Sequence, residues 1–489
     1  MAKPTTLTPW ATTLAAYPIS GLNNRVQPPV GWQTDGWDEN EEPAPNYENY
    51  RAWEAYTWRK WFDEATARPA TVTVASVTVA ADTHADYICD GEGDQVQIQL
   101  AVNTAEAAGG GTVLLSAGVF TVDAAITIDS DKVQIVGCGA GTIIQVAAAA
   151  VTDFNVITLS ATTNSSVINL AIDGNAGVHG HFHSGIVVTG ASAGTVVERV
   201  FFRNMQADGA PDEAYGYGIF GLGTAARTTI NRCSAYACAQ AGYAIAATGT
   251  LPGTMISNSF ARSCGLGGSA AAGSGIVMTG DGGIISGNYV KDCGWGGIQI
   301  GVAGSAAGNS ITCHDNIIHS TTNAPGLYAY GEYNDLHDNH VYTSGTHGIH
   351  LQAFDYGKCH HNEVSTNVGH GIFVDNCHDS QVTDNTIGDS SHLAANAYSN
   401  IHISLGERTD CHGNKFFSRG LPLVKTHIEG DGGAGSGHAL VYGNDCRANS
   451  MGAKILDNFG DFVSLPTYAW DGSAWRQDTA AMGLVNRIA

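Results

Sequence analysis

The sequence has few charged residues and very few positive ones. Only 14% of the 489 residues are Asp, Glu, Lys or Arg, and 22 Lys and Arg stand against 45 Asp and Glu, which gives a formal charge of −23. Nucleic acid and anionic membrane surfaces both attract proteins through positive charge, so they would repel this chain. We therefore expect no nucleic-acid partner.

Long apolar runs and cysteine pairs are also missing. No stretch is long and apolar enough to span a bilayer. The opening MAKPTTLTPWATTLAAYPISG lacks the basic segment and apolar run that mark a signal peptide. None of the 11 cysteines forms a Cys-x-x-Cys pair. We expect synthesis in a cytoplasm without secretion, no membrane insertion, and cysteines that act as small buried hydrophobic residues.

What the sequence does contain is a repeat. Asn339, Asn362 and Asn385 are 23 residues apart, and each of the first two is followed by Gly-Ile and by an apolar residue two places further on. A fixed period in this range is typical of stacked-repeat architectures. With insertions between repeats, the same register extends to other asparagines: Asn204, Asn231, Asn258, Asn288, Asn316, Asn414 and Asn444.

The apolar positions within each repeat lie two residues apart, which predicts short strands rather than helices. Short strands at one period, joined by tight Asn and Gly bends, coil into a parallel β-helix, a solenoid of the all-β class. Asn suits the bend because it tolerates left-handed backbone and its amide can bond to the next coil. The predicted inward ladder is Ile276, Ile298, Leu327, Ile349, Ile372 and Ile401, with Met278, Ile300, Ala329, Leu351, Val374 and Ile403 two residues later.

The residues between these inward pairs must point outward, because successive side chains of a strand face opposite sides. They include aromatic rings, amides, imidazoles and a carboxylate, a set suited to binding sugars. The alternative is an ordinary solvated face, which exposed aromatic residues make less attractive. The predicted substrate-binding residues are Gln299, Tyr328, Tyr330, His350, Gln352, Phe373 and His402.

Carboxylates recur directly after this strand, at Glu332, Asp355, Asp379 and Glu407, on four consecutive coils. Adjacent coils would place two carboxyl groups about 5 Å apart, as in retaining glycosidases, and skipping one coil gives roughly 9–10 Å, the upper edge of the inverting range. Crowding should also raise one pKa and so create a general acid. We predict Asp355, Asp375 and Asp379 as catalytic residues, with Glu332 as fourth choice; the alternative for each is an ordinary loop acid.

Histidine is concentrated in the same half of the chain, with 15 of 19 between His314 and His438. His314, His337 and His360 recur two residues before the repeat Asn, and His412 matches them. Such a column can hold a divalent metal, but imidazoles in register also simply stack on a solvated face. Because the spacing fixes no mixed His–carboxylate triad, we predict no metal and no other cofactor.

A second distinctive stretch runs from Asp94 to Gln145. Val96, Ile98 and Leu100 alternate as in a strand, whereas Asp94 could cap a helix that ends at Gly109. The order of a short helix, a Gly run, TVLLSAGVFTV and VQIVGCGAGTII resembles the opening of pectate-lyase-like right-handed β-helix proteins. The resemblance implies a capping segment, 94–110, whose helix closes the end of the solenoid.

The first seventy residues differ in kind. QPPVGW and NYENYRAWEAYTWRKW resemble the amino-terminal part of bacteriophage tail fibre and tailspike proteins, and so many aromatic residues on one short helix indicate a substantial partner surface. The resemblance implies a homotrimer located in the virion, made in the host cytoplasm, and attached to phage tail or baseplate proteins through residues 1–70. It also implies that the protein recognises a bacterial surface polysaccharide.

These observations divide the chain into an attachment segment 1–70, a β-helix 71–451 and a closing or trimer-contact segment 452–489. The expected function is a phage tailspike that binds, and as a glycoside hydrolase cleaves, capsule or O-antigen. One alternative is a non-catalytic tail adhesin or structural tail protein. Another is a polysaccharide lyase or epimerase, which the absence of Arg and Lys from the outward strand face disfavours. The acids could also act across a groove between subunits.

Overall fold

The computed structural model describes residues 70–446 with short internal gaps, and four further strands between residues 455 and 477. The gaps are 80–83, 179, 208–214, 224–225, 267–272, 305–307, 391–396, 418–427 and 432–438. Apart from Ala70, the predicted attachment segment 1–70 and its aromatic helix lie outside the described residues. The three-part division of the chain therefore stays a prediction.

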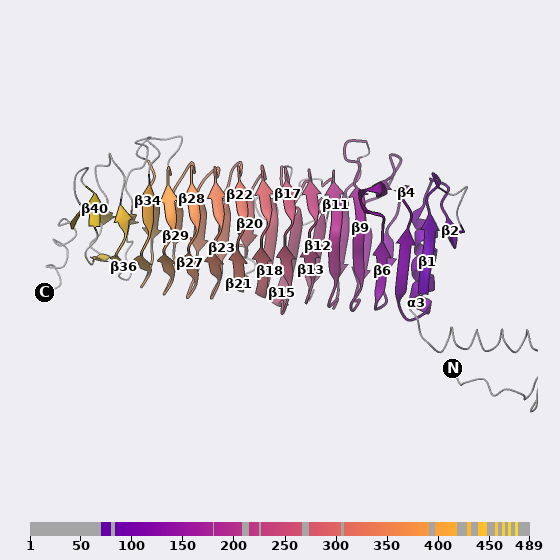
Figure 1. Ribbon diagram of the computed structural model, residues 1–489, viewed down its shortest axis with the longest axis horizontal. Coiled ribbons are helices and arrows are strands. Elements are labelled where there is room, and N and C mark those ends of the chain that lie inside the picture. Colours follow the sequence, from indigo (N-terminus) through magenta and orange to yellow (C-terminus); the bar gives the residue numbers. More distant parts are fainter. Residues whose placement is uncertain are drawn as a thin grey trace, which may run out of the picture. The chain divides into compact units, whose positions relative to one another are not determined.

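The described chain is a parallel β-helix. One coil contains three short strands, such as β26 (Ile349–Gln352), β27 (Lys358–His360) and β28 (Glu363–Ser365). Each pairs in parallel with its equivalent one coil later: β29 (Ile372–Asp375), β30 (Gln381–Thr383) and β31 (Thr386–Gly388). Equivalent strands of successive coils therefore lie side by side along the solenoid (Figure 1).

The remaining strands follow the same plan. The amino-terminal ones are β1 (Ala70–Ala75), β2 (Tyr87–Ile88), β3 (Gly111–Leu115), β4 (Gly118–Val122), β5 (Ile126–Ile128), β6 (Val133–Val136), β7 (Thr142–Val146), β8 (Phe154–Ser160), β9 (Ser166–Asp173), β10 (His183–Thr189) and β11 (Val196–Arg203), with the 3-10 turn η2 (Gly139–Gly141) before β7. The central ones are β12 (Ile219–Gly223), β13 (Thr229–Asn231), β14 (Ser234–Tyr236), β15 (Tyr243–Thr250), β16 (Met255–Ser257), β17 (Phe260–Arg262), β18 (Ser274–Ser286), β19 (Tyr289–Lys291), β20 (Gly296–Ile300), β21 (Gly308–His314) and β22 (Ile317–His319).

The carboxy-terminal strands are β23 (Leu327–Tyr330), β24 (Asp335–His337), β25 (His340–Tyr342), β32 (Ile401–Ser404), β33 (Asp410–His412), β34 (Lys415–Phe417), β35 (Ile428–Asp431), β36 (Ala439–Tyr442), β37 (Asp445–Cys446), β38 (Ile455–Asp457), β39 (Phe462–Ser464), β40 (Tyr468–Trp470) and β41 (Trp475–Gln477). Parallel pairing continues as far as β40, and β40 pairs with β41 in antiparallel fashion.

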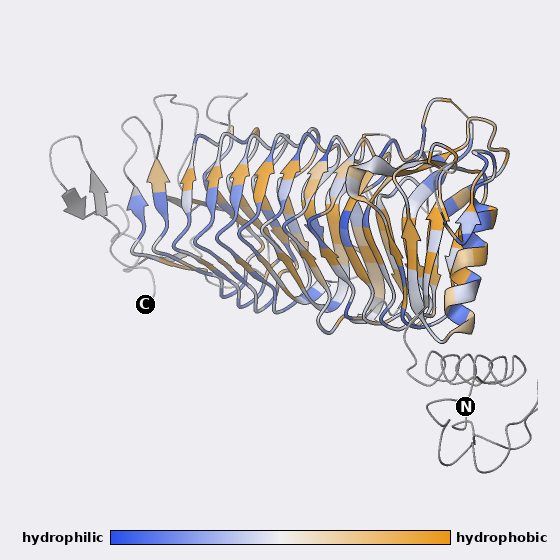
Figure 2. Cartoon of the chain, turned by 45° about the vertical axis from the view of Figure 1, so that its right-hand side comes forward, coloured by the Kyte–Doolittle hydropathy of each residue, from blue (hydrophilic) through white to orange (hydrophobic). Residues whose placement is uncertain are grey.

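A helix covers the amino-terminal end of the coils, as the resemblance to β-helix proteins implied. This helix, α3 (Gln95–Ala107), buries Ile98, Ala101, Val102 and Ala105, while its other side carries polar residues together with the exposed Val96 and Leu100 (Figure 2). Because the first coil has no preceding coil to cover its apolar interior, the helix supplies that cover. Asp94 does not cap the helix with its side chain. Its carboxylate instead accepts hydrogen bonds from the backbone N–H groups of Gly91 and Thr121, at 2.9 and 2.7 Å.

The predicted inward ladder forms the core. Its twelve members, from Ile276 and Met278 to Ile401 and Ile403, are between 0 and 3% exposed. Their strands pair in the predicted register, with Ile349 opposite Leu327 and Ile372 opposite Ile349. The alternation of apolar and polar residues was therefore sufficient to predict which side of each strand faces the interior.

The asparagine ladder is confirmed from Asn288 to Asn444. The side-chain amide of Asn339 donates to Asn362 Oδ1 at 3.0 Å and to the backbone oxygen of Cys313 at 2.8 Å, and Asn362 repeats the pattern with Asn385 at 3.0 Å. These asparagines are buried and link each coil to the next. Since a buried amide without partners costs about 1–3 kcal/mol, the ladder fixes both the bend and the register.

The register placed at Asn204, Asn231 and Asn258 is wrong. The ladder position before Asn288 belongs to Ser259, whose backbone N–H donates to Asn288 Oδ1 at 3.0 Å, and the position before that belongs to Cys233, which donates to Ser259 Oγ at 3.1 Å. Asn204 and Asn258 have a left-handed backbone, with φ of 55° and 51°. These asparagines suit a bend by conformation, without entering the ladder.

The cysteines behave as predicted within the described part of the chain. Ten are free thiols, and all of them except Cys138 are buried. Burial raises the pKa of Cys377 to about 12, so its thiol stays protonated and packs as a small apolar group. Among the described helices, none is long and apolar enough to cross a membrane.

Candidate functional site

The outward side chains of β20, β23, β26, β29, β32 and β35 form two rows. The strand register places the first, which we call the central row, in the order Gln299, Tyr328, His350, Phe373, His402 and Glu429. The second row consists of Tyr330, Gln352, Asp375 and Ser404. Because neighbouring strands lie about 4.8 Å apart, adjacent members of a row are within reach of one another. All seven predicted substrate-binding residues lie in these two rows.

Asp375 ends a chain of hydrogen bonds that crosses between the rows. The Tyr328 hydroxyl donates to Gln352 Oε1 at 2.7 Å, and the Gln352 amide donates to Asp375 Oδ2 at 3.0 Å. His350 Nε2 lies 3.9 Å from the same carboxylate oxygen. The nearby imidazole and the Gln352 amide lower the pKa of Asp375, so the carboxylate is ionised at neutral pH.

Phe373 lies at the centre of four imidazoles. The centroid distances from its ring to those of His347, His350, His370 and His402 are 4.8, 4.9, 5.5 and 5.3 Å. His347 and His370 come from the residues just before β26 and β29, next to the central row. Phe373 is half-buried, so the cluster presents one aromatic surface rather than isolated rings.

Two of these imidazoles are neutral. Burial and the neighbouring histidines lower the pKa of His347 and of His370 to about 3. The backbone N–H of His370 donates to His347 Nδ1 at 3.1 Å, and that of Ser399 donates to His370 Nδ1 at 3.0 Å. With Nδ1 as acceptor, each ring carries its proton on Nε2 and can donate from there.

Glu429 brings a buried carboxylate to the end of the central row. It is 3% exposed, and its Oε2 accepts a hydrogen bond from Ser399 Oγ at 2.6 Å. The same oxygen lies 3.5 Å from His402 Nδ1. A buried carboxylate requires compensating partners, and the hydroxyl of Ser399 provides one. His402 and Glu429 form a second His–carboxylate pair, on the other side of Phe373 from His350 and Asp375.

The other predicted carboxylates lie in the turn after the site strands, away from the two rows. Asp355 Oδ1 accepts hydrogen bonds from the backbone N–H of His378 at 2.7 Å and from its ring Nδ1 at 3.0 Å. Asp379 is held by Arg408 through two hydrogen bonds of 2.6 Å. Glu332 is exposed. The structure therefore brings Asp375 together with the predicted sugar-binding residues, but not Asp355, Asp379 or Glu332.

The predicted register of these turn acids holds for Glu332 and Asp355, which occupy equivalent positions of adjacent coils, but it is wrong by one residue for Asp379. His378, not Asp379, is the neighbour of Asp355 in the adjacent coil, since the Tyr356 N–H donates to His378 O at 2.9 Å and His378 bridges to Glu407. The imidazole of His378 thus lies beside Asp355, where we expected the carboxylate of Asp379. The expected rise in pKa is also wrong for Asp379, because the guanidinium of Arg408 lowers its pKa, and for Asp375, where the pKa is lowered too.

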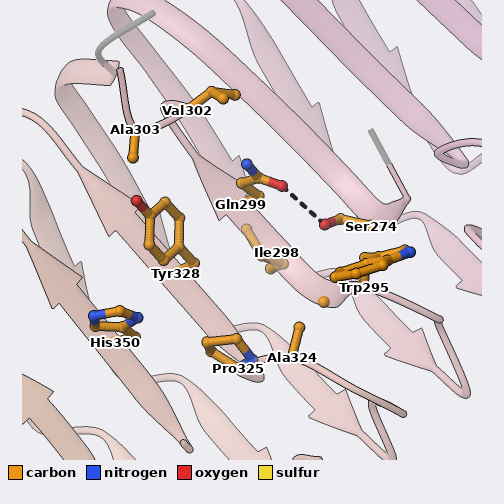
Figure 3. Close-up of a pocket in the computed structure, with 11 residues that line it drawn as sticks. Ser274, Trp295, Ile298, Gln299, Val302, Ala303, Ala324, Pro325, Tyr328 and His350 are labelled. Carbon is orange, nitrogen blue, oxygen red and sulfur yellow. Dashed lines mark hydrogen bonds between the residues drawn. The ribbon is translucent and has the colours of Figure 1, made fainter. Parts of the chain in front are cut away.

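A pocket of about 350 Å³ adjoins the start of the central row. Figure 3 shows Trp295 and Tyr328 on opposite sides of Ile298 and Gln299. The remaining lining residues are Ser274, Gly296, Val302, Ala303, Ala324, Pro325 and His350. The pocket therefore adjoins the predicted binding residues Gln299, Tyr328 and His350.

Several residues of this surface were missed from the sequence. His347 and His370 each precede a Gly-Ile pair, so the recurring His-Gly-Ile was a signal that points to them. Glu429 gave no such signal, since the sequence around it reads His-Ile-Glu-Gly and lacks the Gly before Ile. Trp295 stands just before β20 in a segment that the repeat does not define.

In the histidine column, the imidazole rings stack on one another and each has a carboxylate partner. The His314, His337 and His360 rings are nearly parallel, with centroids 4.9 and 5.2 Å apart. Each has a carboxylate within hydrogen-bonding distance, from Asp315, Asp338 and Asp335 respectively. Among the described residues, no group of three or more His, Cys, Asp or Glu side chains is arranged to hold a metal ion.

Comparison with known proteins agrees with this architecture. Residues 155–334 and 274–449 match the family described as the right-handed beta helix region. This match confirms the predicted fold class, including its handedness. No curated protein matches the chain.

Two solved structures share this fold at low sequence identity. The A-module of mannuronan C-5 epimerase AlgE6 from Azotobacter vinelandii is 18% identical, with a TM-score of 0.54 over 80% of this chain and 99% of the module. The AlgE4 A-module from the same organism is 17% identical, with a TM-score of 0.53 over 78% and 97%. The Dettilon tailspike protein gp208 is 14% identical, with a TM-score of 0.45 over 76% and 66%.

Proposed function

Because the chain belongs to the right-handed β-helix family, we propose that it binds a polysaccharide along the central row and hydrolyses it, with Asp375 as the main catalytic carboxylate. The substrate class is a bacterial surface polysaccharide, capsule or O-antigen. The solenoid supports this proposal because its stacked coils present one continuous line of side chains to a long ligand.

The observation that carries the proposal is that Phe373 and Asp375 lie on the same strand, β29. Phe373 and the imidazoles around it offer a cluster of aromatic rings for contact with the apolar face of a sugar. Asp375 lies two residues along the same strand, ionised and held by Gln352 at 3.0 Å. A bound sugar would thus have an aromatic platform and, in Asp375, one of the two catalytic groups that glycoside hydrolysis requires.

Hydrolysis also requires a proton donor. Asp375 is ionised and suits the role of base or nucleophile. In our proposal His402, which lies 3.5 Å from the buried carboxylate of Glu429, donates the proton to the leaving oxygen. Asp355, Asp379 and Glu332 remain proposed acids of second rank, because they lie in the turn and two of them already have cationic or imidazole partners.

The biological setting in our proposal is a phage tailspike, a homotrimer carried by the virion. Support for it comes from the QPPVGW and NYENYRAWEAYTWRKW motifs, whose resemblance to tail fibre and tailspike proteins implies attachment to tail or baseplate proteins through residues 1–70. The net charge of −23 favours a neutral polysaccharide over a polyanionic one.

The test is to incubate the purified chain with a panel of bacterial surface polysaccharides. New reducing ends and the ultraviolet absorbance of unsaturated uronates are followed separately, in the wild type and in Asp375→Asn and Asp355→Asn. We expect reducing ends without that absorbance, abolished by Asp375→Asn and retained in Asp355→Asn.

Other outcomes would replace the proposal. Absorbance from unsaturated products would make the protein a lyase, and inverted uronate stereochemistry without cleavage would make it an epimerase. Binding with no product from any polysaccharide would leave a non-catalytic adhesin. Reducing ends that survive Asp375→Asn but not Asp355→Asn would move the catalytic site to the turn.

A further inference from the structure

The central row changes character at one coil. Before Gln299 it continues as Val187, Phe220, Ala244 and Val277, one per coil. These side chains point away from the solenoid interior and yet are only 3–9% exposed. They pack with Tyr217, whose ring stacks on that of Phe220 at 4.4 Å. The outward row is therefore buried from Val187 as far as Gln299, which is 8% exposed, and it is partly exposed from Tyr328 to His402.

The pocket lies at this boundary and has apolar walls. Trp295 is 38% exposed despite its size, and it lines the pocket together with Pro325 and Ala324. The backbone N–H of Trp295 donates to Gly273 O at 3.0 Å. A Cβ at Gly273 would come within 2.5 Å of the indole ring, so the glycine leaves room for Trp295 to occupy this position.

The polar groups of the pocket are fixed by hydrogen bonds. Ser274 Oγ donates to Gln299 Oε1 at 3.1 Å, as Figure 3 shows, and Gln299 Nε2 donates to Gly301 O at 3.2 Å. The orientation of the amide is thus set before a ligand arrives, which reduces the entropy cost of binding. The Tyr328 hydroxyl, held by Gln352, faces the same space.

No described lining residue is a Lys or an Arg. The titratable groups that face the pocket are Tyr328 and His350, and burial raises the pKa of Tyr328 to about 12. The ionised carboxylate of Asp375 lies near both of them. A uronate would therefore enter without a cation to pair with.

We propose that the pocket beside Trp295 is the end subsite of the groove and binds one neutral pyranose residue, with Trp295 and Pro325 against its apolar face and the polar groups of Gln299 and Tyr328 within reach of its hydroxyls. This inference rests on the proposed function, which it extends by naming the ligand class and the end of the groove. Asp375 lies three coils further on, about 14 Å along the solenoid axis, so cleavage there would release short oligosaccharides of fixed length from the chain end.

The test is saturation-transfer NMR on the full purified chain. The probes are the methyl glycosides of glucose, galactose, mannose, rhamnose and N-acetylglucosamine, compared with glucuronic and galacturonic acid. We expect transfer to at least one neutral glycoside, and weaker transfer to both acids. Trp295→Ala should weaken that binding about tenfold, and Trp295→Phe should restore most of it. Tyr236→Ala, which removes a 49% exposed aromatic ring far from the lining, is the matched control.

The inference is overturned if no neutral glycoside gives transfer, if the uronic acids bind at least as tightly, or if Trp295→Ala binds as the wild type does. Gln299→Leu supplies a second test if Trp295→Ala does not fold, and it should also weaken binding. A separate digest distinguishes this inference from the proposed function. Polysaccharide cleavage with the same product lengths in Trp295→Ala would reject the end subsite alone, whereas glycoside binding without cleavage of any polysaccharide would reject the hydrolase alone.

Discussion

The two halves of one sheet face differ although their interiors are built alike. In β10, β12, β15 and β18 the outward row is Val187, Phe220, Ala244 and Val277, buried beneath other parts of the chain. In β23, β26, β29 and β32 the same row is Tyr328, His350, Phe373 and His402, which are partly exposed. On the inner side, both halves carry buried residues that are mostly aliphatic, with Tyr243 and Gly221 as exceptions in the first half.

This difference distinguishes the inward residues, which stabilise the fold, from the outward residues, which are available for binding. The inward ladder has to repeat, because each coil packs on the next, whereas the outward row is free to vary from coil to coil. Where the row is apolar it serves as packing for a cover, and where it is polar and aromatic it is available to a ligand. The predictions below test this separation, from the largest expected effect to the smallest.

The largest effect is expected from Asp375→Asn. The substitution removes the ionised carboxylate from the partly exposed half of the sheet face while keeping the shape of the side chain. The rate of polysaccharide cleavage should therefore fall on the order of 10²–10⁴-fold. Reducing-end assays measure the rate, and thermal denaturation checks the fold. Asp338→Asn, which changes an exposed aspartate beside His337 outside both rows, is the control and should keep its activity. Equal activity in the two variants would remove Asp375 from the mechanism.

Substitutions in the inward ladder should lower the stability of the fold. Ile372→Ala empties a fully buried position of the core and should lower the free energy of unfolding by about 2–5 kcal/mol. The control is Ile317→Ala, at a position 40% exposed, which should change it by less than about 0.5 kcal/mol. Chemical denaturation measures both. Similar losses at the two sites would contradict the assignment of inward and outward sides.

The burial of the apolar half of the sheet face can be tested at Val277. Val277→Asn places an amide in the covered apolar cluster and should lower the free energy of unfolding by about 2–4 kcal/mol. Ile284→Asn, on the same strand at a position 39% exposed, should cost much less. If both variants unfold at the same denaturant concentration, the face is open at Val277 and the groove does not end there.

Much of this architecture could be predicted from the sequence, because stacking imposes a period on it. The positions of Ile349, Ile372 and Asn362 follow from alternation and spacing alone. The acids of the turn could not be predicted in this way, since one residue of offset exchanges Asp379 for His378 beside Asp355. Glu429 and Trp295 were also missed, because their position depends on insertions between repeats, which the period does not describe.

Phe373→Ala should weaken polysaccharide binding about tenfold without unfolding the chain. The ring is half-buried on the outward side, so it contributes a surface for sugar more than it contributes to the core. Isothermal titration against the polysaccharide that gives products measures the affinity. Tyr333→Ala, at a tyrosine 58% exposed in the turn, is the matched control. A large loss of stability with unchanged affinity would make Phe373 a packing residue like Phe220.

The smallest effect, and the most specific one, is expected in the pH profile of His350→Gln. The imidazole of His350, 3.9 Å from Asp375, and the Gln352 amide lower the pKa of that carboxyl, and His402 contributes to the same shift. If ionised Asp375 is required, a lowered pKa keeps the enzyme active into the acid range. Removing the imidazole should raise the pKa of Asp375 towards its ordinary value, so the acidic limb of kcat/KM should move to higher pH with little change in rate at neutral pH. His337→Gln, in the stacked column outside the two rows, should leave the limb in place. A limb that stays, or moves to lower pH, would mean that Asp375 does not set it and that the catalytic charge belongs to another group, of which the buried pair of His402 and Glu429 is the nearest.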